Sequence, residues 1–351
     1  MVSNRKKVFV ALSGGVDSSV AAALLNQNGF DCSGVFITTC DESHHARADA
    51  EQIAKKLGIK LHILDLRKDF EHILDYFCSE YKKGRTPNPC VFCNRHIKFG
   101  KLWNFARSNG AELLATGQYA RIFEHNNQTG LYEGLNSDKD QSYVLSMIDK
   151  KILPYIILPM GEYSKDQARQ MAKKFNLGIE HKTESQEICF IPNDNHIAVL
   201  EQRCPELVRK GNIIDSSGKV LGQHDGIHRF TIGQRRGLRV AMGKPYYVVK
   251  IDAATNTITL GPKEELMQSK FWATDVNWLI EEPVQSFGAK VKIRYNDIGS
   301  PASVQPQGKN VMVEFNEPNS AITPGQLAAF YIQEGKNSRC IGGAWIDKVV
   351  N

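Results

Sequence analysis

A glycine-rich loop placed directly between a strand and a helix is the feature that most limits how this chain can fold. The apolar run 7–12 predicts a strand, the loop SGGVDSS (residues 13–19) follows at once, and an Ala/Leu-rich helix is predicted over 18–26. Two adjacent glycines let the backbone turn sharply and approach a ligand closely. A buried strand that leads into a helix in this way is typical of a parallel sheet covered by helices.

The next hundred residues repeat this alternation. Further strands are predicted at 34–37, 61–64 and 113–116, and further helices at 46–56, 68–81 and 97–108. Strands and helices that alternate at this pace indicate an α/β fold with a Rossmann-like parallel sheet.

From about residue 210 the pattern changes to short β-rich runs bounded by Gly, Asn, Asp and Pro. Residues 246–252 and 257–260 predict a hairpin, and further runs lie at 271–278, 289–295, 310–315, 326–332 and 341–346. Several short strands at such spacing suggest a small barrel. We therefore expect three regions: an α/β domain that carries the glycine-rich loop (1–198), a small middle domain (199–266) and a C-terminal β-barrel (267–351).

Charge and hydropathy say little about the partners and the compartment of the protein. Lys and Arg number 44 against 38 Asp and Glu, a net charge of +6, which suits a polyanionic partner without requiring one. No apolar stretch approaches the roughly 18 residues that a membrane span needs, and no signal peptide is recognisable, so we expect a cytoplasmic protein without a membrane partner. In that reducing compartment the eight cysteines should be mostly free thiols.

The SGGVDSS loop predicts a phosphate site. The helix behind it offers unpaired N–H groups and the positive end of its dipole, and Ser13, Ser18 and Ser19 add hydroxyl groups. The lysine of a Walker motif is missing, so this is not an ordinary P-loop. The alternative is a plain Ser/Gly turn with Ser18 as the helix N-cap, but the strand–loop–helix context favours a nucleotide.

Two cysteine segments indicate thiol chemistry. In GRTPNPCVFCN (84–94) a loop is expected to end where a helix begins near Asn94, and a helix N-terminus together with nearby basic residues would favour a thiolate at Cys93. A second cysteine, Cys189, lies in the loop-like segment SQEICFIP (185–192). The alternatives are half a zinc site at Cys90-x-x-Cys93 and a buried core thiol at Cys189. We expect the other five cysteines (32, 40, 78, 204 and 340) to be core or surface thiols.

These motifs together resemble a known family. SGGVDSS resembles the PP-loop signature of the ATP pyrophosphatases, which adenylate an oxygen and release pyrophosphate. GRTPNPCVFCN, ATGQY (115–119), DKDQSY (138–143), EICFI (187–191) and TIGQRRGL (231–238) resemble, in the same order, segments of the tRNA-specific 2-thiouridylases. The resemblance extends from residue 8 into the C-terminal region.

The resemblance implies an enzyme, a tRNA-uridine 2-sulfurtransferase that acts on the wobble uridine at position 34. ATP would adenylate the uracil O2, Cys189 would carry a persulfide received from a sulfur-donor protein, and Cys93 would act on that persulfide. Asp17 would help to place Mg²⁺.

The resemblance also implies which residues contact the ligands. The nucleotide would be bound by Ala11, Leu12, Ser13, Gly14, Gly15, Val16, Asp17, Ser18, Ile37 and Gly117. The target base would be contacted by Asn88, Pro89 and Cys90. The rest of the tRNA would be contacted by Gln118, Lys139, Asp140, Gln141, Arg294, Tyr295 and Gln326.

Three departures from the family pattern leave alternatives open. The segment FITTCDE (36–42) and a short run after it stand where the family has F-M-K-N-W and an acidic insertion. Gln118 stands where His is usual, and Cys90 stands where Asp is common. With Cys93 and Cys189, Cys90 gives three thiols that could instead hold a [4Fe–4S] cluster. Two other functions are possible interpretations. An amide-forming PP-loop synthetase would leave Cys93 and Cys189 unexplained, and a non-enzymatic RNA-binding protein would leave the intact SGGVDSS loop unexplained.

Overall fold

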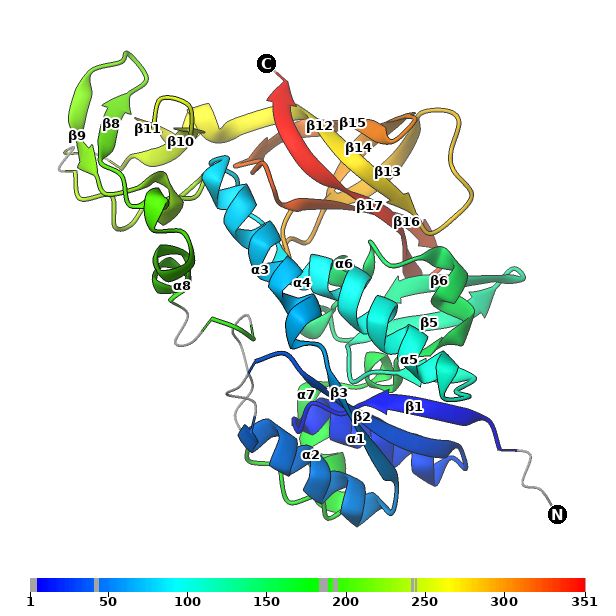
Figure 1. The fold of residues 1–351 in the computed structure, drawn as a ribbon. Helices are drawn as coiled ribbons and strands as arrows, with labels where there is room; N and C mark the ends of the chain where they lie inside the picture. Colours follow the sequence, from blue (N-terminus) through cyan, green and yellow to red (C-terminus); the bar gives the residue numbers. More distant parts are fainter. Residues whose placement is uncertain are drawn as a thin grey trace.

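The computed structural model describes residues 5–40, 44–182, 189–191, 195–240, 243 and 245–350. Its N-terminal part is a five-stranded parallel sheet in the order β3-β2-β1-β4-β7 (Figure 1), which confirms the predicted α/β fold. The strands are β1 (Lys7–Ala11), β2 (Asp31–Thr38), β3 (Lys60–Asp65), β4 (Leu113–Ala115) and β7 (Ile156–Ile157).

Helices cover both faces of this sheet because the central strand is apolar on both sides. Val8 and Val10 pack in the same cluster as residues of α1 (Val16–Gln27), α2 (His44–Leu57) and α7 (Lys165–Lys174). Phe9 packs in the opposite cluster with residues of α5 (Leu102–Ser108). Helix α3 (Arg67–Lys82) runs from the sheet toward the C-terminal strands (Figure 1).

The C-terminal strands close into a six-stranded barrel, as expected. The order is β12-β15-β14-β13-β16-β17, and β12 pairs with both β15 and β17. The strands are β12 (Met267–Trp278), β13 (Phe287–Lys292), β14 (Ser300–Gln307), β15 (Asn310–Ser320), β16 (Leu327–Glu334) and β17 (Asn337–Val350). Strand β14 was not predicted, because its two prolines (301 and 306) weaken its strand signal.

A hairpin of the N-terminal region extends the barrel sheet. Strands β5 (Ala120–His125) and β6 (Gln128–Glu133) pair with each other, and β6 pairs with β17 through Leu131 and Tyr132. The barrel and the α/β region are therefore joined by backbone hydrogen bonds as well as by side chains.

The middle region is a separate small sheet with its own apolar cluster. Its order is β10-β11-β8-β9, formed by β8 (Gly211–Asp215), β9 (Val220–His224), β10 (Tyr247–Asp252) and β11 (Thr257–Gly261), and α8 (His196–Arg203) precedes it. The predicted hairpin is confirmed as β10 and β11. The domain boundaries at 198/199 and 266/267 remain predictions. Among the described residues, no helix is both long and apolar enough to cross a membrane.

A buried charge network joins the barrel to the α/β region. The Lys292 ammonium lies 2.6 Å from Glu133 Oε1 and 3.4 Å from Asp140 Oδ2. Burial acts to lower the pKa of Lys292, but the two carboxylates outweigh it and leave that pKa raised. Asp140 also accepts hydrogen bonds from the Gly134 and Ser142 amides and from the Ser142 hydroxyl.

We predict that Asp140→Asn destabilises the protein by about 3 kcal/mol, because it leaves the buried Lys292 without one of its two counter-charges. Urea unfolding followed by circular dichroism measures this loss. Arg47→Ala is the matched control: it breaks an exposed ion pair with Glu51 and should cost less than about 0.5 kcal/mol. Equal losses in the two variants would contradict a structural role for the buried network.

Candidate active site

The SGGVDSS loop has the geometry of an anion site. Helix α1 begins at Val16, and its N-cap, Gly15, provides no side-chain acceptor for the first N–H groups of the helix. The Ser18 and Ser19 hydroxyls donate to Gly15 O at 3.2 and 2.8 Å, and Ser13 Oγ lies 3.0 Å from Ser18 Oγ. The serines thus shape the loop, and the helix N-terminus is left to bind an anion.

Two glycines are needed here for close packing. Gly14 has φ +74°, and a Cβ there would lie 2.5 Å from Ala46 O. A Cβ on Gly117 would lie 2.4 Å from Ser18 N. The ATGQY segment therefore packs directly against the start of α1.

Two lysines converge on the loop from outside the motif, and sequence reasoning missed both. Lys165, the first residue of α7, donates to Asp17 Oδ1 and Oδ2 at 2.7 and 2.8 Å, and the Tyr119 hydroxyl donates to Asp17 Oδ1 at 2.6 Å. Lys182 donates to Gly14 O at 2.9 Å and pairs with Asp49. Neither lysine lies in a recognised motif, so only the fold brings them to the loop.

The thiol segment folds differently from the prediction. Helix α4 (Pro89–Cys93) starts five residues earlier than expected: Pro89 occupies its first turn, and Asn88 accepts a hydrogen bond from Val91 N as the N-cap. The chain then continues without a break into a π-helix, η2 (Asn94–Lys101), and α5, where one helix over 97–108 was predicted. Cys90 lies in the first turn, whereas Cys93 lies at the end of α4.

The expectation of a lowered thiol pKa is therefore wrong. Desolvation raises the pKa of Cys93, and the nearby Lys98 only partly opposes this. The pKa of Cys90 is raised for the same reason. Cys93 lies too far along the helical segment to gain from the dipole of its N-terminus.

Cys189 joins the other thiols. Desolvation and then the charge of Cys93 raise its pKa to about 12, and Cys90 and Cys40 act in the same direction. Cys40, which we had expected to be an unremarkable thiol, therefore lies at this site. It follows β2 by two residues, at the carboxyl edge of a parallel sheet where ligand sites usually form.

Aromatic packing anchors the segment that carries Cys189. Phe190 makes edge contacts with Phe70 and Phe77, at centroid distances of 5.5 and 5.4 Å. Phe190, Cys93 and Ile37 pack against one apolar cluster. Part of the Cys189 residue is exposed at the surface, although the surrounding protein desolvates its thiol. Residues 185–188 and 192 of its predicted motif, like Asp41 and Glu42, lie outside the described residues.

The thiols do not form a recognisable metal centre. Within the described ranges, no group of three or more His, Cys, Asp or Glu side chains is arranged to hold a metal ion. The geometry therefore gives the [4Fe–4S] alternative no support.

Several residues assigned to tRNA by resemblance are instead engaged within the protein. Asp140 is buried in the charge network, and Gln141 Oε1 accepts from Tyr119 N at 2.9 Å. Gln118 is buried, with its Nε2 3.5 Å from Asn94 Oδ1. Gln326 Nε2 donates to Thr86 O and Pro87 O at 2.9 and 3.3 Å.

Arg294 and Tyr295 are exposed, and Lys139 is half-buried. Arg294 also has a partner within the protein, since its Nη2 donates to Ala321 O at 2.7 Å. The predicted strand 289–295 ends early, at Lys292, because Asp297 accepts from Ile293 N and starts a loop. Tyr295 therefore lies in a loop, with its ring centroid 6.3 Å from that of Tyr143.

The barrel holds the loop that precedes α4 in the chain. Arg85 donates to Glu80 Oε2 at 2.7 Å, to Asp347 Oδ1 at 2.8 Å and to Ile346 O at 3.0 Å. Thr86 N donates to Pro324 O at 2.9 Å. The position of α4, and hence of Cys90 and Cys93, thus depends on the C-terminal domain.

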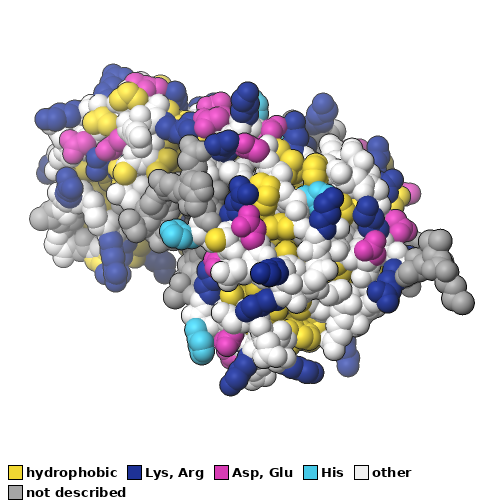
Figure 2. Space-filling model, turned by 60° about the horizontal axis from the view of Figure 1, so that its bottom comes forward, with side chains coloured by type: hydrophobic (Ala, Val, Ile, Leu, Met, Phe, Trp, Pro, Cys, Tyr) yellow, Lys and Arg dark blue, Asp and Glu magenta, His cyan; other side chains and the backbone are white. Residues whose placement is uncertain are grey.

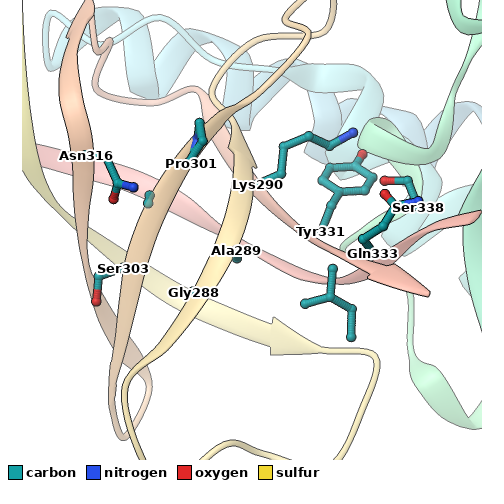
Figure 3. Close-up of a pocket in the computed structure, with 11 residues that line it drawn as sticks. Gly288, Ala289, Lys290, Pro301, Ser303, Asn316, Tyr331, Gln333 and Ser338 are labelled. Carbon is teal, nitrogen blue, oxygen red and sulfur yellow. The ribbon is translucent and has the colours of Figure 1, made fainter. Parts of the chain in front are cut away.

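A separate depression on the barrel is lined by none of the cysteines or SGGVDSS residues described above. It has a volume of about 560 Å³, with Lys290, Tyr331 and Ser338 on one side and Ser303 and Asn316 on the other (Figure 3). Lys290 is already paired with Glu133. Among the described residues that line it, there is no thiol, imidazole or carboxylate.

The surface charges are mixed on the face of the molecule that Figure 2 shows, where Lys and Arg are scattered among Asp and Glu.

Comparisons with known proteins cover the whole chain. Residues 6–193 match the family described as tRNA methyl transferase HUP domain, 197–262 its PRC-barrel domain, and 268–346 the aminomethyltransferase beta-barrel domain. The tRNA-specific 2-thiouridylase MnmA of Carboxydothermus hydrogenoformans is 44% identical, over 99% of this chain and 99% of that protein. The protein of the same name from Syntrophotalea carbinolica is 44% identical, over 99% and 100%.

One solved structure gives a weaker match. A 4-thiouridine synthetase–RNA complex with bound ATP is 20% identical, with a TM-score of 0.37, over 57% of this chain and 51% of that one. This similarity is too low to carry an argument about the site.

We predict that Lys165→Met lowers ATP-dependent pyrophosphate release about 100-fold, because a charge beside the phosphate loop is lost. Lys174→Met on the same helix is the control, since Lys174 is exposed and should leave turnover unchanged. A pyrophosphate assay measures both rates, and thermal melts check that both variants are folded. Normal release by Lys165→Met would remove this lysine from the site.

Proposed function

The chain belongs to the family of the tRNA-specific 2-thiouridylases, and we propose that it uses ATP to replace an oxygen of a tRNA uridine with sulfur. The observation that carries this proposal is the link between the phosphate loop and the thiol helix. Gly117 packs on Ser18 N, Gln118 reaches Asn94 beside Cys93, and the Tyr119 hydroxyl bonds Asp17. Three consecutive residues thus connect the two halves of the reaction.

The first half-reaction is the adenylation of the uracil O2 of the wobble uridine at position 34. The oxygen attacks the α-phosphorus of ATP and pyrophosphate leaves. This step converts an oxygen that is a poor leaving group into AMP, which leaves readily. The free N–H groups at the start of α1 suit the anionic phosphates, and Lys165 and Lys182 add positive charge there.

Asp17 is the carboxylate that would hold Mg²⁺ at this loop, since carboxylate oxygens are the ligands that this ion prefers. Bound there, Mg²⁺ would offset the negative charge of the phosphates. Lys165 already compensates Asp17, so it is placed to shift to a phosphate oxygen when the nucleotide binds.

The second half-reaction moves sulfur from protein to base. The outer sulfur of a Cys189 persulfide attacks C2, and AMP leaves. The Cys93 thiolate then attacks the inner sulfur, so that a Cys93–Cys189 disulfide forms and the outer sulfur stays on C2. A thiol or dithiol reductant returns two electrons and two protons and resets the pair. In the other variant Cys93 first releases the outer sulfur as sulfide, which attacks C2 itself.

The exposure of Cys189 supports loading by a separate sulfur-donor protein. Asn88, Pro89 and Cys90 lie at the start of α4 beside Cys93, which suits contact with the target base. Arg294 and Lys139 suit phosphates, and the exposed ring of Tyr295 suits stacking on a splayed base. For Asp140, Gln141 and Gln326, whose inward hydrogen bonds are described above, we propose roles that position the loops around the base.

The middle region adds positive charge for the same partner. Residues 197–262, which match the PRC-barrel domain and make up most of the predicted middle domain, contain ten Lys and Arg against five Asp and Glu, so most of the net charge of +6 lies there. Arg235 and Arg236 are exposed in its loop. This distribution supports contact of the middle region with tRNA phosphates.

The test is thiolation with purified components. Unmodified tRNA with a wobble uridine, ATP, Mg²⁺ and a persulfide donor are incubated with the protein, and the nucleosides are analysed by mass spectrometry. We expect 2-thiouridine at position 34 with one AMP and one pyrophosphate per sulfur. A methylated nucleoside, or no change in the tRNA, would contradict the proposal.

The cysteine variants separate the two sulfur mechanisms. We predict that Cys93→Ser and Cys189→Ser each abolish thiolation while ATP-dependent pyrophosphate release persists, and that Cys90→Ser keeps most activity. Protein purified without oxygen should be colourless, and Cys189 should gain one sulfur from the donor. Loss of activity in Cys90→Ser together with loss of bound iron would favour a cluster instead.

A further inference from the structure

The π-helix that follows Cys93 gives that residue an unusual neighbour. In η2 the amide of Leu102 donates to Ile97 O, five residues earlier. The absent Cβ of Gly100 would lie 3.1 Å from Arg95 O, again five residues earlier. Long π-helical segments are rare and are frequently found at functional sites.

This winding changes which side chain lies beside Cys93. In an α-helix the residue five positions on would point roughly 140° away around the axis. In a π-helix residues five apart lie about one turn apart on the same side. Lys98 is five residues after Cys93, so the winding of η2 brings its side chain to the side that carries the thiol.

The charges on this helix are distributed unevenly. Arg95 pairs with Asp275 of the barrel at 2.6 Å, and Lys101 pairs with Asp69 of α3 at 2.8 Å. Lys98 is half-buried, and in the described part of the chain no carboxylate within ion-pair distance accompanies it. A cation in such a place needs an anion, since burial without a counter-charge is unfavourable.

The charge of Lys98 acts on three thiols. Its charge acts to lower the pKa of Cys90, Cys93 and Cys189, against the desolvation that raises all three. The other cations on this helix, Arg95 and Lys101, are held in the two ion pairs just described. The His96 ring packs against Phe92 in a tilted arrangement, at a centroid distance of 4.3 Å.

We propose that Lys98 is the counter-cation of the thiol site, where it binds the anionic sulfur of Cys93 and of the Cys189 persulfide. This inference rests on the proposed function for its role in turnover, but its electrostatic part does not. A desolvated thiol is a poor nucleophile because little of it is ionised, and an ammonium beside it restores the thiolate. The π-helix provides this charge to a cysteine that the helix dipole does not reach.

The first test measures thiol reactivity without tRNA or ATP. Lys98→Met should slow alkylation of Cys93 and Cys189 by iodoacetamide at neutral pH about tenfold, which corresponds to one unit of thiol pKa. Peptide mass analysis reports each cysteine separately. Lys98→Arg should restore most of the rate because it keeps the charge. Lys101 lies on the same helix as Lys98 and pairs with Asp69 of α3. Lys101→Met breaks that ion pair, and its cysteines should react as fast as those of the unmodified chain.

The second test measures turnover. Lys98→Met should lower kcat for thiolation about tenfold or more and leave the affinity for tRNA and the release of pyrophosphate unchanged. Equal alkylation rates in Lys98→Met and the unmodified chain, or an equal fall in Lys101→Met, would overturn the inference while leaving the proposed function intact. If Lys98→Met is alkylated more slowly but the unmodified chain does not thiolate tRNA, the proposed function is refuted and the electrostatic role of Lys98 stands.

Discussion

The docking of the barrel onto the α/β domain is the interaction on which the rest of the structure depends. Lys292 of the barrel is buried between Glu133 and Asp140 of the other region, and charges are stable in such surroundings only when each has its partner. The neighbouring hydroxyls complete the junction: Ser142 Oγ lies 3.0 Å from the Tyr331 hydroxyl, and Tyr143 donates to Leu327 O at 2.9 Å. Pairing of β6 with β17 makes the joint continuous.

This joint determines where the thiols lie. The loop before α4 is held by Arg85, Thr86 and Gln326 against the barrel, and α4 presents Cys90 and Cys93. On the other side, Asn94 donates to Val144 O at 3.0 Å in the segment that follows Asp140. Helix α4 and its two cysteines are therefore attached to this junction from both sides. In the function proposed above, the barrel would thus help to position Cys93 beside the bound base.

The α/β fold could be predicted because its signals are local. Apolar strands, the double glycine and the amphipathic helices each depend on neighbours in the sequence, and the observed ends of these elements differ from the predicted ones by only a few residues. The thiol segment was predicted less well. Asn88 and Pro89 form a good helix start, but the glycine and prolines of GRTPNP suggested a longer loop, and this error produced the wrong expectation for the Cys93 pKa.

The sequence by itself determined the chemistry that the chain carries: a phosphate-binding loop, two cysteine segments and a β-rich C-terminal half. Residue types and short spacings are sufficient for this, because glycine conformations, helix dipoles and thiol chemistry are local properties. Only the tertiary structure decided which groups act together. It brought Lys165 and Lys182 to the loop, added Cys40 to the thiols, and turned Asp140 and Gln326 inward. These outcomes depend on burial and on partners more than a hundred residues away, such as Lys292 for Asp140, which no local pattern encodes.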